Sequence, residues 1–153
     1  MDIEKKEMKQ DKDPSLHLMV VLSHAYKSIM DYAKKDIKQY EINFTEFGVL
    51  ELLYHKGPQP IQQIRHRILL ASGSITYVVD QLEKKGYLKR RPCPDDRRVT
   101  YAELTDKGNQ LLKEIFPKHK QALKSAMSGL EEEEKETLIL LLKKLGISIK
   151  EQS

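Results

Sequence analysis

The 153-residue sequence predicts a mainly α-helical domain that carries one small β-hairpin. Across most of the chain, apolar residues recur at steps of three and four, which is the spacing of amphipathic helices. Only the segments YLKRR and VTYAEL are short, rich in β-branched or aromatic residues and separated by a turn-rich sequence, which favours a hairpin. The length suits a single core and offers no obvious division, so we expect one folding unit per subunit.

The composition indicates a cytoplasmic protein without membrane contact. No apolar run approaches the roughly 20 residues that cross a bilayer. The first residues, MDIEKKEMKQDKDP, carry mixed charges and lack the apolar stretch of a signal peptide. The single cysteine, Cys93, excludes a disulfide within the chain, which fits a reducing compartment.

The N-terminal part is expected to be a flexible tail followed by a long helix. Residues 1–14 are charged and poor in apolar groups, which is typical of a tail, and residues 15–153 form the single domain. From Leu16 onward, an apolar stripe predicts a helix of about 25 residues. The positions of this stripe are Met19, Ser23, Tyr26, Met30, Ala33 and Ile37.

Two shorter helices are predicted next. Either Asn43 or Thr45 can cap the first, which ends at Gly57, where Pro58 forbids continuation. Its inward side chains are expected to be Phe47, Leu50, Leu53 and Tyr54. Pro60 suits the first turn of the second helix, whose apolar positions are Ile61, Ile64 and Ile68.

A helix over residues 72–85 is predicted after a break at residues 71–73. It ends at Gly86, and its apolar face consists of Ile75, Val78, Val79 and Leu82. Together with the preceding short helix it forms a helix-turn-helix candidate. The hairpin around PCPDD follows directly and would then be a wing.

The C-terminal third predicts two more helices. Thr105 can cap the first, Pro117 is expected to bend it, and its apolar stripe includes Leu111, Leu112, Ile115, His119, Leu123 and Met127. After Gly129, a glutamate-rich first turn suits the positive end of a helix dipole. The last helix has an apolar face of Leu138, Leu141, Leu142 and Leu145. The first and last helices would expose these stripes in a monomer, so we expect them to pair with a second subunit.

Positive charge is concentrated in the middle of the chain. Residues 60–98 contain nine lysines and arginines against four aspartates and glutamates, although the whole chain has a formal net charge of only +4. Such a basic segment is typical of a nucleic-acid-binding surface.

The candidate DNA-binding residues lie on the 72–85 helix and on the hairpin. The polar face of the helix offers side chains suited to base edges and phosphates in the major groove, namely Ser72, Ser74, Thr76, Tyr77 and Gln81. At the hairpin tip, Arg97 is expected to enter the minor groove. Contacts to flanking phosphates are expected from Lys89, Arg90, Arg91 and Arg98. A nearby carboxylate, Asp95 or Asp96, can hold one of these arginines in a fixed orientation.

The sequence resembles the MarR family of winged helix-turn-helix regulators. The segment LEKKGYLKR is followed by a turn and by DDRRVTYAELTDKG, which matches the Asp-Arg-Arg and Leu-Thr-x-x-Gly signature of that family. The matching positions are Asp96, Arg97, Arg98, Leu104, Thr105 and Gly108. TEFGVLELL and SITYVVDQLEKKG also match, and the likeness covers roughly residues 16–147.

This resemblance implies a homodimer that binds a pseudo-palindromic DNA operator. Residues 15–42 and 109–153 would form the dimerisation helices, and residues 43–108 the winged helix-turn-helix lobe. The 72–85 helix would be the recognition helix and Arg97 the wing arginine. The resemblance also implies repression, relieved by a small ligand or by oxidation, of stress, detoxification or efflux genes. FTEFGVLELLYHKG, ILLASGSITYVVDQLEKKGYL and PCPDDRRVTYA are similar to the repressors that respond to hydroquinones, quinones and catechols.

Two sensing chemistries remain open on the sequence. Cys93 lies among arginines that favour a thiolate, which reacts with quinones and peroxides. Oxidation sensors of the family, however, usually carry their cysteine near the N-terminus, where this chain has none. The alternative is reversible binding of a small aromatic or quinone effector between the two lobes. The aromatic and histidine side chains available for such a cleft are His17, His24, Tyr26, Tyr40, Phe44, Phe47 and Tyr54, which can equally be core residues.

Other functional classes are less well supported. The five histidines are scattered without the spacing of a zinc site, so we expect no metal and no cofactor. A nucleophile elbow and a glycine-rich phosphate loop are both missing from the sequence, and Cys93 lacks a recognisable base, so we expect no enzyme. A winged-helix module that binds a protein partner instead of specific DNA is the main alternative, and activation in place of repression also stays open.

Overall fold

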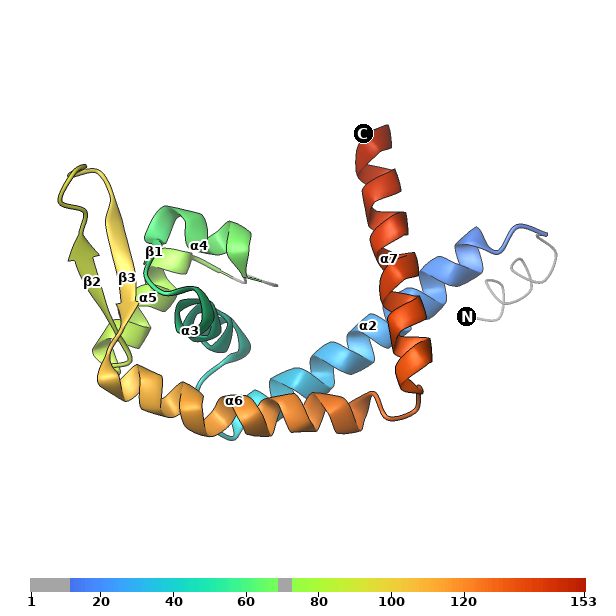
Figure 1. Cartoon of the computed structure of the whole chain (residues 1–153), viewed down its shortest axis with the longest axis horizontal. Helices are drawn as coiled ribbons and strands as arrows, with labels where there is room; N and C mark the ends of the chain where they lie inside the picture. The colour runs from blue at the N-terminus through green and yellow to red at the C-terminus, as the bar shows by residue number, and fades with distance from the viewer. Residues whose placement is uncertain (1–11, 69–72) are drawn as a thin grey trace.

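The computed structural model describes residues 12–68 and 73–153, and it confirms the predicted fold class (Figure 1). Helices dominate, and one small antiparallel sheet forms beside them. The elements are α2 (Ser15–Lys38), α3 (Phe44–Lys56), β1 (Gln59–Pro60), α4 (Ile61–Arg67), α5 (Ile75–Lys84), β2 (Leu88–Pro92), β3 (Thr100–Leu104), α6 (Asp106–Ala126) and α7 (Glu132–Gln152).

Helix α3 begins with a reciprocal cap. The side-chain oxygen of Asn43 accepts a hydrogen bond from the Glu46 N–H at 2.8 Å, and Glu46 Oε1 accepts one from the Asn43 N–H at 3.0 Å. Asn43 is therefore the cap, whereas Thr45 lies inside the first turn. The other oxygen of the buried Glu46 accepts from Lys85 Nζ at 2.9 Å. The same carboxylate thus joins the start of α3 to the end of α5.

Helix α5 is shorter at its start than the sequence indicated. The expectation of a helix from residue 72 is wrong, because Gly73 adopts a left-handed conformation with φ of +75° and Ser74 occupies the cap position. Regular helix begins at Ile75. The predicted apolar face is confirmed, since Ile75, Val78, Val79 and Leu82 are all buried.

The sheet contains the predicted hairpin and one strand that was not predicted. Strands β2 and β3 pair from Leu88 opposite Leu104 to Pro92 opposite Thr100. The two-residue strand β1 pairs with the other edge of β3, which gives the order β1-β3-β2. A strand of two residues that includes a proline carries no alternation from which it could be predicted. Through β1, the connection between α3 and α4 is fixed to the wing.

The core lies in the winged part of the chain. Leu50 of α3, Ile64 of α4, Leu82 of α5 and Leu88 of β2 are almost completely buried together. Ile37 from the end of α2 and Ile115 from α6 join the same cluster. The earlier residues of α2 and all of α7 remain outside it, as Figure 1 shows: α6 runs from the hairpin to the loop before α7, which rises away from the winged part.

Candidate nucleic-acid interface

Helix α5 turns a polar face outward, opposite its buried residues. Thr76 and Tyr77 are exposed, Tyr77 to 62%, and Gln81 is half-buried. Ser74 lies at the start of this face, where its hydroxyl accepts a hydrogen bond from the Tyr77 N–H at 3.4 Å. Ser72, a fifth candidate, lies outside the described residues. Ser74 therefore lies at the start of the helix, and Thr76, Tyr77 and Gln81 follow along its outward side, an arrangement that suits a major groove.

Arg90 holds β2 against α5. Its guanidinium donates to Asp80 Oδ1 at 2.5 Å and to Glu83 Oε1 at 2.9 Å, and its backbone N–H donates to Glu83 Oε2 at 3.1 Å. The hydrogen bond with Asp80 is the main reason that the pKa of Arg90 rises above its ordinary value. Because both carboxylates come from α5, this arginine fixes the wing relative to the candidate recognition helix. A phosphate contact by Arg90 remains a prediction.

The wing tip contains one paired arginine and one unpaired arginine. Arg98 donates from Nε to Asp96 Oδ1 at 3.1 Å and from Nη2 to Asp96 Oδ2 at 3.2 Å. These hydrogen bonds hold the pKa of Asp96 below its ordinary value of 3.8, so the carboxylate stays charged at neutral and mildly acidic pH. Within the described residues, the side chain of Arg97 is exposed and has neither a hydrogen bond nor an ion pair. Asp96, expected as one of two possible orienting carboxylates, thus acts on Arg98.

The remaining basic side chains of β2 are exposed. Arg91 Nε lies 3.3 Å from Glu103 Oε2 on β3, and its guanidinium carbon lies 5.7 Å from the ring centre of Tyr101. Lys89 is exposed on the same strand. Exposed ion pairs such as Arg91 with Glu103 contribute little to stability and exchange easily for another anion.

Helix α4 adds two polar residues that the sequence did not single out. Gln62 Nε2 donates to the backbone oxygen of Arg98 at 3.2 Å, and Arg65 Nη1 donates to the backbone oxygen of Gly73 at 2.8 Å. The three-residue spacing of Gln62 and Arg65, away from the buried Ile64, was the signal that could have identified them. One side of α4 therefore contacts both the wing and the turn before α5.

A concavity opens between α4, α5 and the wing. Its volume is about 410 Å³, and its lining is formed by Ile61, Gln62, Arg65, Ser74, Ile75, Thr76, Arg90 and Thr100. Two arginines, two threonines, a serine and a glutamine give it a lining rich in hydrogen-bond donors. It lies between the two elements that the sequence assigned to adjacent DNA grooves.

The seven candidate effector residues do not form one cleft in a single chain. His17, His24 and Tyr26 are exposed on the first half of α2. By contrast, Phe47 is a buried core residue, and the partly buried side chains that pack against the core include Tyr40, Phe44 and Tyr54. The 24-residue length of α2 separates the two groups. An effector role for these residues stays a prediction.

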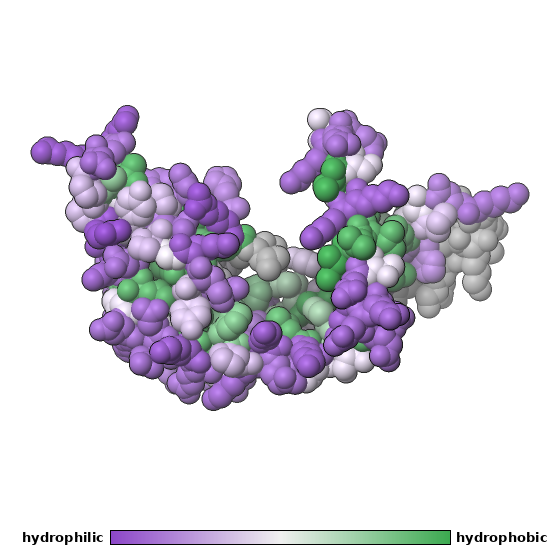
Figure 2. All heavy atoms as spheres, viewed as in Figure 1, coloured by the Kyte–Doolittle hydropathy of each residue, from purple (hydrophilic) through white to green (hydrophobic). Residues whose placement is uncertain are grey.

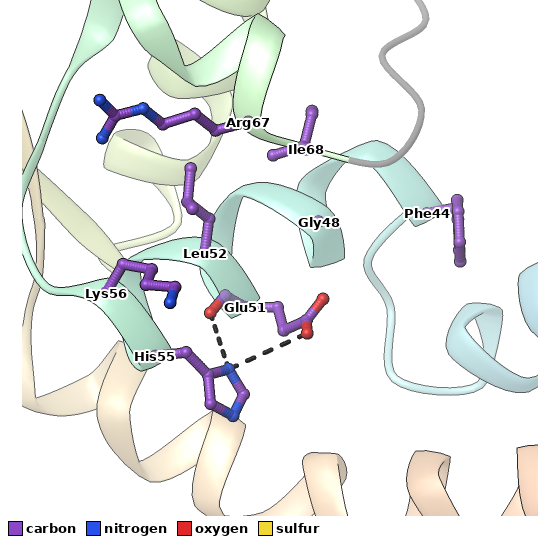
Figure 3. Close-up of a pocket in the computed structure, with 8 residues that line it drawn as sticks. All are labelled: Phe44, Gly48, Glu51, Leu52, His55, Lys56, Arg67 and Ile68. Atoms are coloured by element: carbon purple, nitrogen blue, oxygen red, sulfur yellow. Dashed lines mark hydrogen bonds and ion pairs between the residues drawn. The ribbon is translucent and has the colours of Figure 1, made fainter. Parts of the chain in front are cut away.

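A smaller pocket of about 230 Å³ lies between α3 and the end of α4 (Figure 3). Of the seven effector candidates only Phe44 lines it, and the other lining residues are Gly48, Glu51, Leu52, His55, Lys56, Arg67 and Ile68. Within the pocket wall, His55 Nδ1 lies 3.0 Å from the backbone oxygen of Glu51. The pocket combines an aromatic ring and aliphatic groups with one carboxylate, one imidazole and two cationic side chains, those of Lys56 and Arg67.

A buried polar pair joins α2 to α6 beneath α3. His119 Nδ1 lies 2.7 Å from Asp36 Oδ2, and the imidazole is only 5% exposed. The ring of Phe47 packs edge-on against the imidazole with centroids 4.8 Å apart. The same Asp36 contributes to raising the pKa of Tyr40, after the larger effect of burial. The pair therefore joins two of the long terminal helices to each other, and the Phe47 contact adds α3 of the winged part.

Cys93 lies in the turn that follows β2. Its backbone N–H donates to the Val99 oxygen at 3.0 Å, and the residue is partly exposed. No group of three or more histidine, cysteine, aspartate or glutamate side chains with metal-binding geometry occurs among residues 12–68 and 73–153. Over the same residues, no helix is both long enough and apolar enough to cross a membrane.

Comparison with known proteins relates the chain to DNA-binding regulators. Residues 42–100 match the MarR family. The HTH-type transcriptional regulator MhqR of Bacillus subtilis is 54% identical over 139 residues, which cover 91% of this chain and 96% of the relative. Transcriptional repressor MprA of Escherichia coli is 32% identical over 80% of this chain and 70% of its own length.

Solved structures show the same fold. Sco3205, a MarR family transcriptional regulator from Streptomyces coelicolor whose structure was solved in complex with DNA, superposes with a TM-score of 0.75. The likeness covers 86% of this chain and 90% of the other at 20% sequence identity. The winged arrangement is therefore retained at low sequence identity.

Proposed function

The chain belongs to the MarR family of DNA-binding transcriptional regulators, and from this premise we propose that it is a homodimeric, sequence-specific repressor. Each α5 helix enters a major groove of a pseudo-palindromic operator, and each wing enters the adjacent minor groove. The two half-site centres lie about one helical turn apart, or roughly 10 base pairs. The repressed genes serve stress responses, detoxification or efflux.

The single observation that carries this proposal is the fixed placement of two different DNA-reading elements. Arg90 ties the wing to α5 through Asp80 and Glu83, so the polar face of the helix and the hairpin tip keep one separation. Thr76, Tyr77 and Gln81 then read base edges, while the unpaired Arg97 extends into the minor groove. Arg91 and Arg98 contact phosphates. Arg90 acts mainly by positioning, because two carboxylates already neutralise it.

Dimerisation is supported by apolar surface outside the core. Helix α7 has no buried residue, and Figure 2 shows green, apolar side chains on the face that α7 presents. The exposed apolar residues of α2 and α7 include Leu16, Leu18, Met19, Leu22, Leu138, Leu141, Leu142 and Leu145. Large exposed apolar faces are rare on soluble monomers, and a second copy of the chain, which carries the same faces, would cover them.

Release from DNA follows binding of a small aromatic or quinone effector. The chain is similar to repressors that respond to hydroquinones, quinones and catechols, and the pocket lined by Phe44 offers an aromatic ring beside polar groups. Covalent sensing by Cys93 is the second candidate, supported by the partial exposure of the residue. In either case the effector shifts the population toward a dimer whose two wings no longer match the operator spacing.

The deciding experiment measures fluorescence anisotropy of labelled promoter DNA, taken from upstream of the protein's own coding region, against scrambled DNA. We expect tight binding to the promoter, with a steep fall in affinity as salt rises, and release on addition of benzoquinone. Release that persists in Cys93→Ala assigns sensing to reversible binding, whereas loss of release in that variant assigns it to the thiol.

Two outcomes would oppose the proposal. Specific binding without any release by quinone would retain the repressor and reject this class of effector. Equal, weak binding to every duplex tested would instead favour a winged-helix module that binds a protein partner.

A further inference from the structure

We propose that the concavity between α4, α5 and the wing is the seat for the DNA backbone phosphate that separates the major groove from the minor groove, and that Arg65 is its principal ligand. This inference rests on the proposed function. It adds a phosphate-binding residue on α4, a helix from which neither the sequence nor the comparisons select a DNA contact.

The topology of duplex DNA requires such a seat. If α5 lies in a major groove and the wing lies in the adjacent minor groove, one phosphodiester strand must pass between them. The surface between α5 and the wing is the concavity of about 410 Å³, which reaches from Ser74 and Thr76 on α5 to Thr100 at the start of β3. The strand therefore crosses this concavity.

The lining suits a phosphate. Besides Arg65, its donors are the hydroxyls of Ser74, Thr76 and Thr100 and the amide of Gln62. In the first turn of α5, the Tyr77 N–H donates to the Ser74 hydroxyl, whereas the N–H groups of Ile75 and Thr76 have no acceptor within the helix and lie at its positive end; this ten-residue helix has no acidic residue in its first turn. Charged and neutral donors thus converge on one anion.

Of the two arginines in the lining, Arg65 is the one available to a ligand. Arg90 is engaged by the carboxylates of Asp80 and Glu83. Arg65 uses Nη1 to donate to the Gly73 oxygen at 2.8 Å, a neutral acceptor that leaves its charge uncompensated. The same hydrogen bond restrains the guanidinium before DNA arrives, so less side-chain entropy is lost on binding.

The test compares the salt dependence of promoter binding for the wild-type chain, Arg65→Ala, Arg65→Gln and Arg67→Ala. Arg67 is a matched control because it lies on the same helix and carries the same charge, but donates to Gln59 and to Gln63 and lines the other pocket. The slope of log K against log salt is negative, and each lost phosphate contact reduces its steepness by about 0.9, so a dimer that loses two contacts has a slope less steep by about 1.8. Arg65→Gln retains an amide donor and removes only the charge.

We expect both Arg65 variants to make the slope less steep by about 1.8 and Arg67→Ala to leave it unchanged. A lower affinity with an unchanged slope would show that Arg65 only supports the turn, and would overturn the seat without touching the proposed function. If the wild-type chain binds no DNA, the proposed function itself fails and the seat with it.

A second measurement locates the phosphate. In a footprinted promoter, single phosphates are replaced by neutral methylphosphonates. At one position in each half-site the replacement should weaken binding of the wild-type chain strongly and binding of Arg65→Ala less, because only the neutral donors of the lining still contact that phosphate in the variant. If the loss of affinity caused by Arg65→Ala and the loss caused by each methylphosphonate simply add at every position, Arg65 does not contact a phosphate directly.

Discussion

Four arginines of the wing differ in what already holds them. Arg90 is bound by two carboxylates of α5, Arg98 by Asp96 and Arg91 by Glu103, whereas Arg97 has no partner within the described residues. An arginine that is already paired must exchange one anion for another when DNA binds, which reduces its net gain. Arg97 therefore has the most to gain from a narrow minor groove with high negative potential.

At this scale we expect Arg97→Ala to weaken binding to promoter DNA by roughly 30-fold or more, because the dimer loses one contact of about 1–3 kcal/mol from each of its two wings. Lys120→Ala is the control, because Lys120 is equally exposed but lies on α6. Anisotropy titrations of both variants at one salt concentration provide the measurement. An affinity for Arg97→Ala equal to that of the control would refute its role.

The sequence predicted that these arginines lie on one hairpin but not which of them form ion pairs. The pairing depends on the hairpin register and on the distance between α5 and β2, which arise from tertiary packing. Arg65 was missed for a similar reason. Its importance depends on a concavity bounded by three elements, and no local pattern encodes that.

At the scale of elements, the junction between β3 and α6 is closed by a tight set of contacts. Thr105 caps α6 by accepting from the Gly108 N–H at 3.2 Å, and its hydroxyl donates to the Gly86 oxygen at 2.5 Å. The backbone of Gly108 lies so near the wing that a Cβ there would lie 2.0 Å from the carbonyl oxygen of Tyr87. The Leu-Thr-x-x-Gly signature thus has a steric cause.

We expect Gly108→Ala to destabilise the protein by about 2–3 kcal/mol, because the added methyl group must displace the Tyr87 backbone. The matched control is Gly129→Ala, since a Cβ at Gly129 would meet nothing within 4 Å. Thermal unfolding at equal protein concentration should show a lower Tm for Gly108→Ala alone. Equal Tm values for the two variants would mean that the junction between β3 and α6 accommodates the added methyl group without loss of stability.

Most elements were predictable because each carries a local signal. Asn43, Thr105, Gly57 and Gly86 mark helix ends in the sequence as they do in the structure. The start of α5 was not predictable, because a serine is an equally good helix cap at position 72 and at position 74. The left-handed conformation of Gly73 places the cap at Ser74. Strand β1 exists only because β3 is beside it.

At the scale of the whole molecule, the single chain leaves long apolar faces uncovered. Its core occupies the winged part, whereas α7 buries nothing and much of α2 is exposed. The sequence predicted this surplus of apolar surface from the stripes. The sequence could not place the effector candidates relative to one another. His17, His24 and Tyr26 lie on the exposed first half of α2, whereas Phe47 of α3 belongs to the core, and this separation arises from tertiary packing.

We expect the double substitution Leu141→Lys with Leu145→Lys to convert a dimer into a monomer of 17.8 kDa and to weaken promoter binding by at least about 100-fold, as the loss of bivalency implies. Glu136→Lys places the same side chain away from that face of α7 and should leave the dimer intact. Sedimentation equilibrium measures the mass. A dimer that survives the double substitution would move the interface elsewhere.

Helix α6 joins the wing to the terminal helices without a linker, since its cap residue follows β3 directly and its 21 residues continue through Pro117. At 1.5 Å per residue, the part of α6 between His119 and Asp106 spans about 20 Å, so a tilt of about 9° at the α2 contact displaces the wing end by about 3 Å. The helix therefore works as a lever. A shift at the Asp36–His119 contact that is smaller than the width of an atom therefore suffices to move α5 relative to its proposed DNA groove. No hinge is needed for this movement.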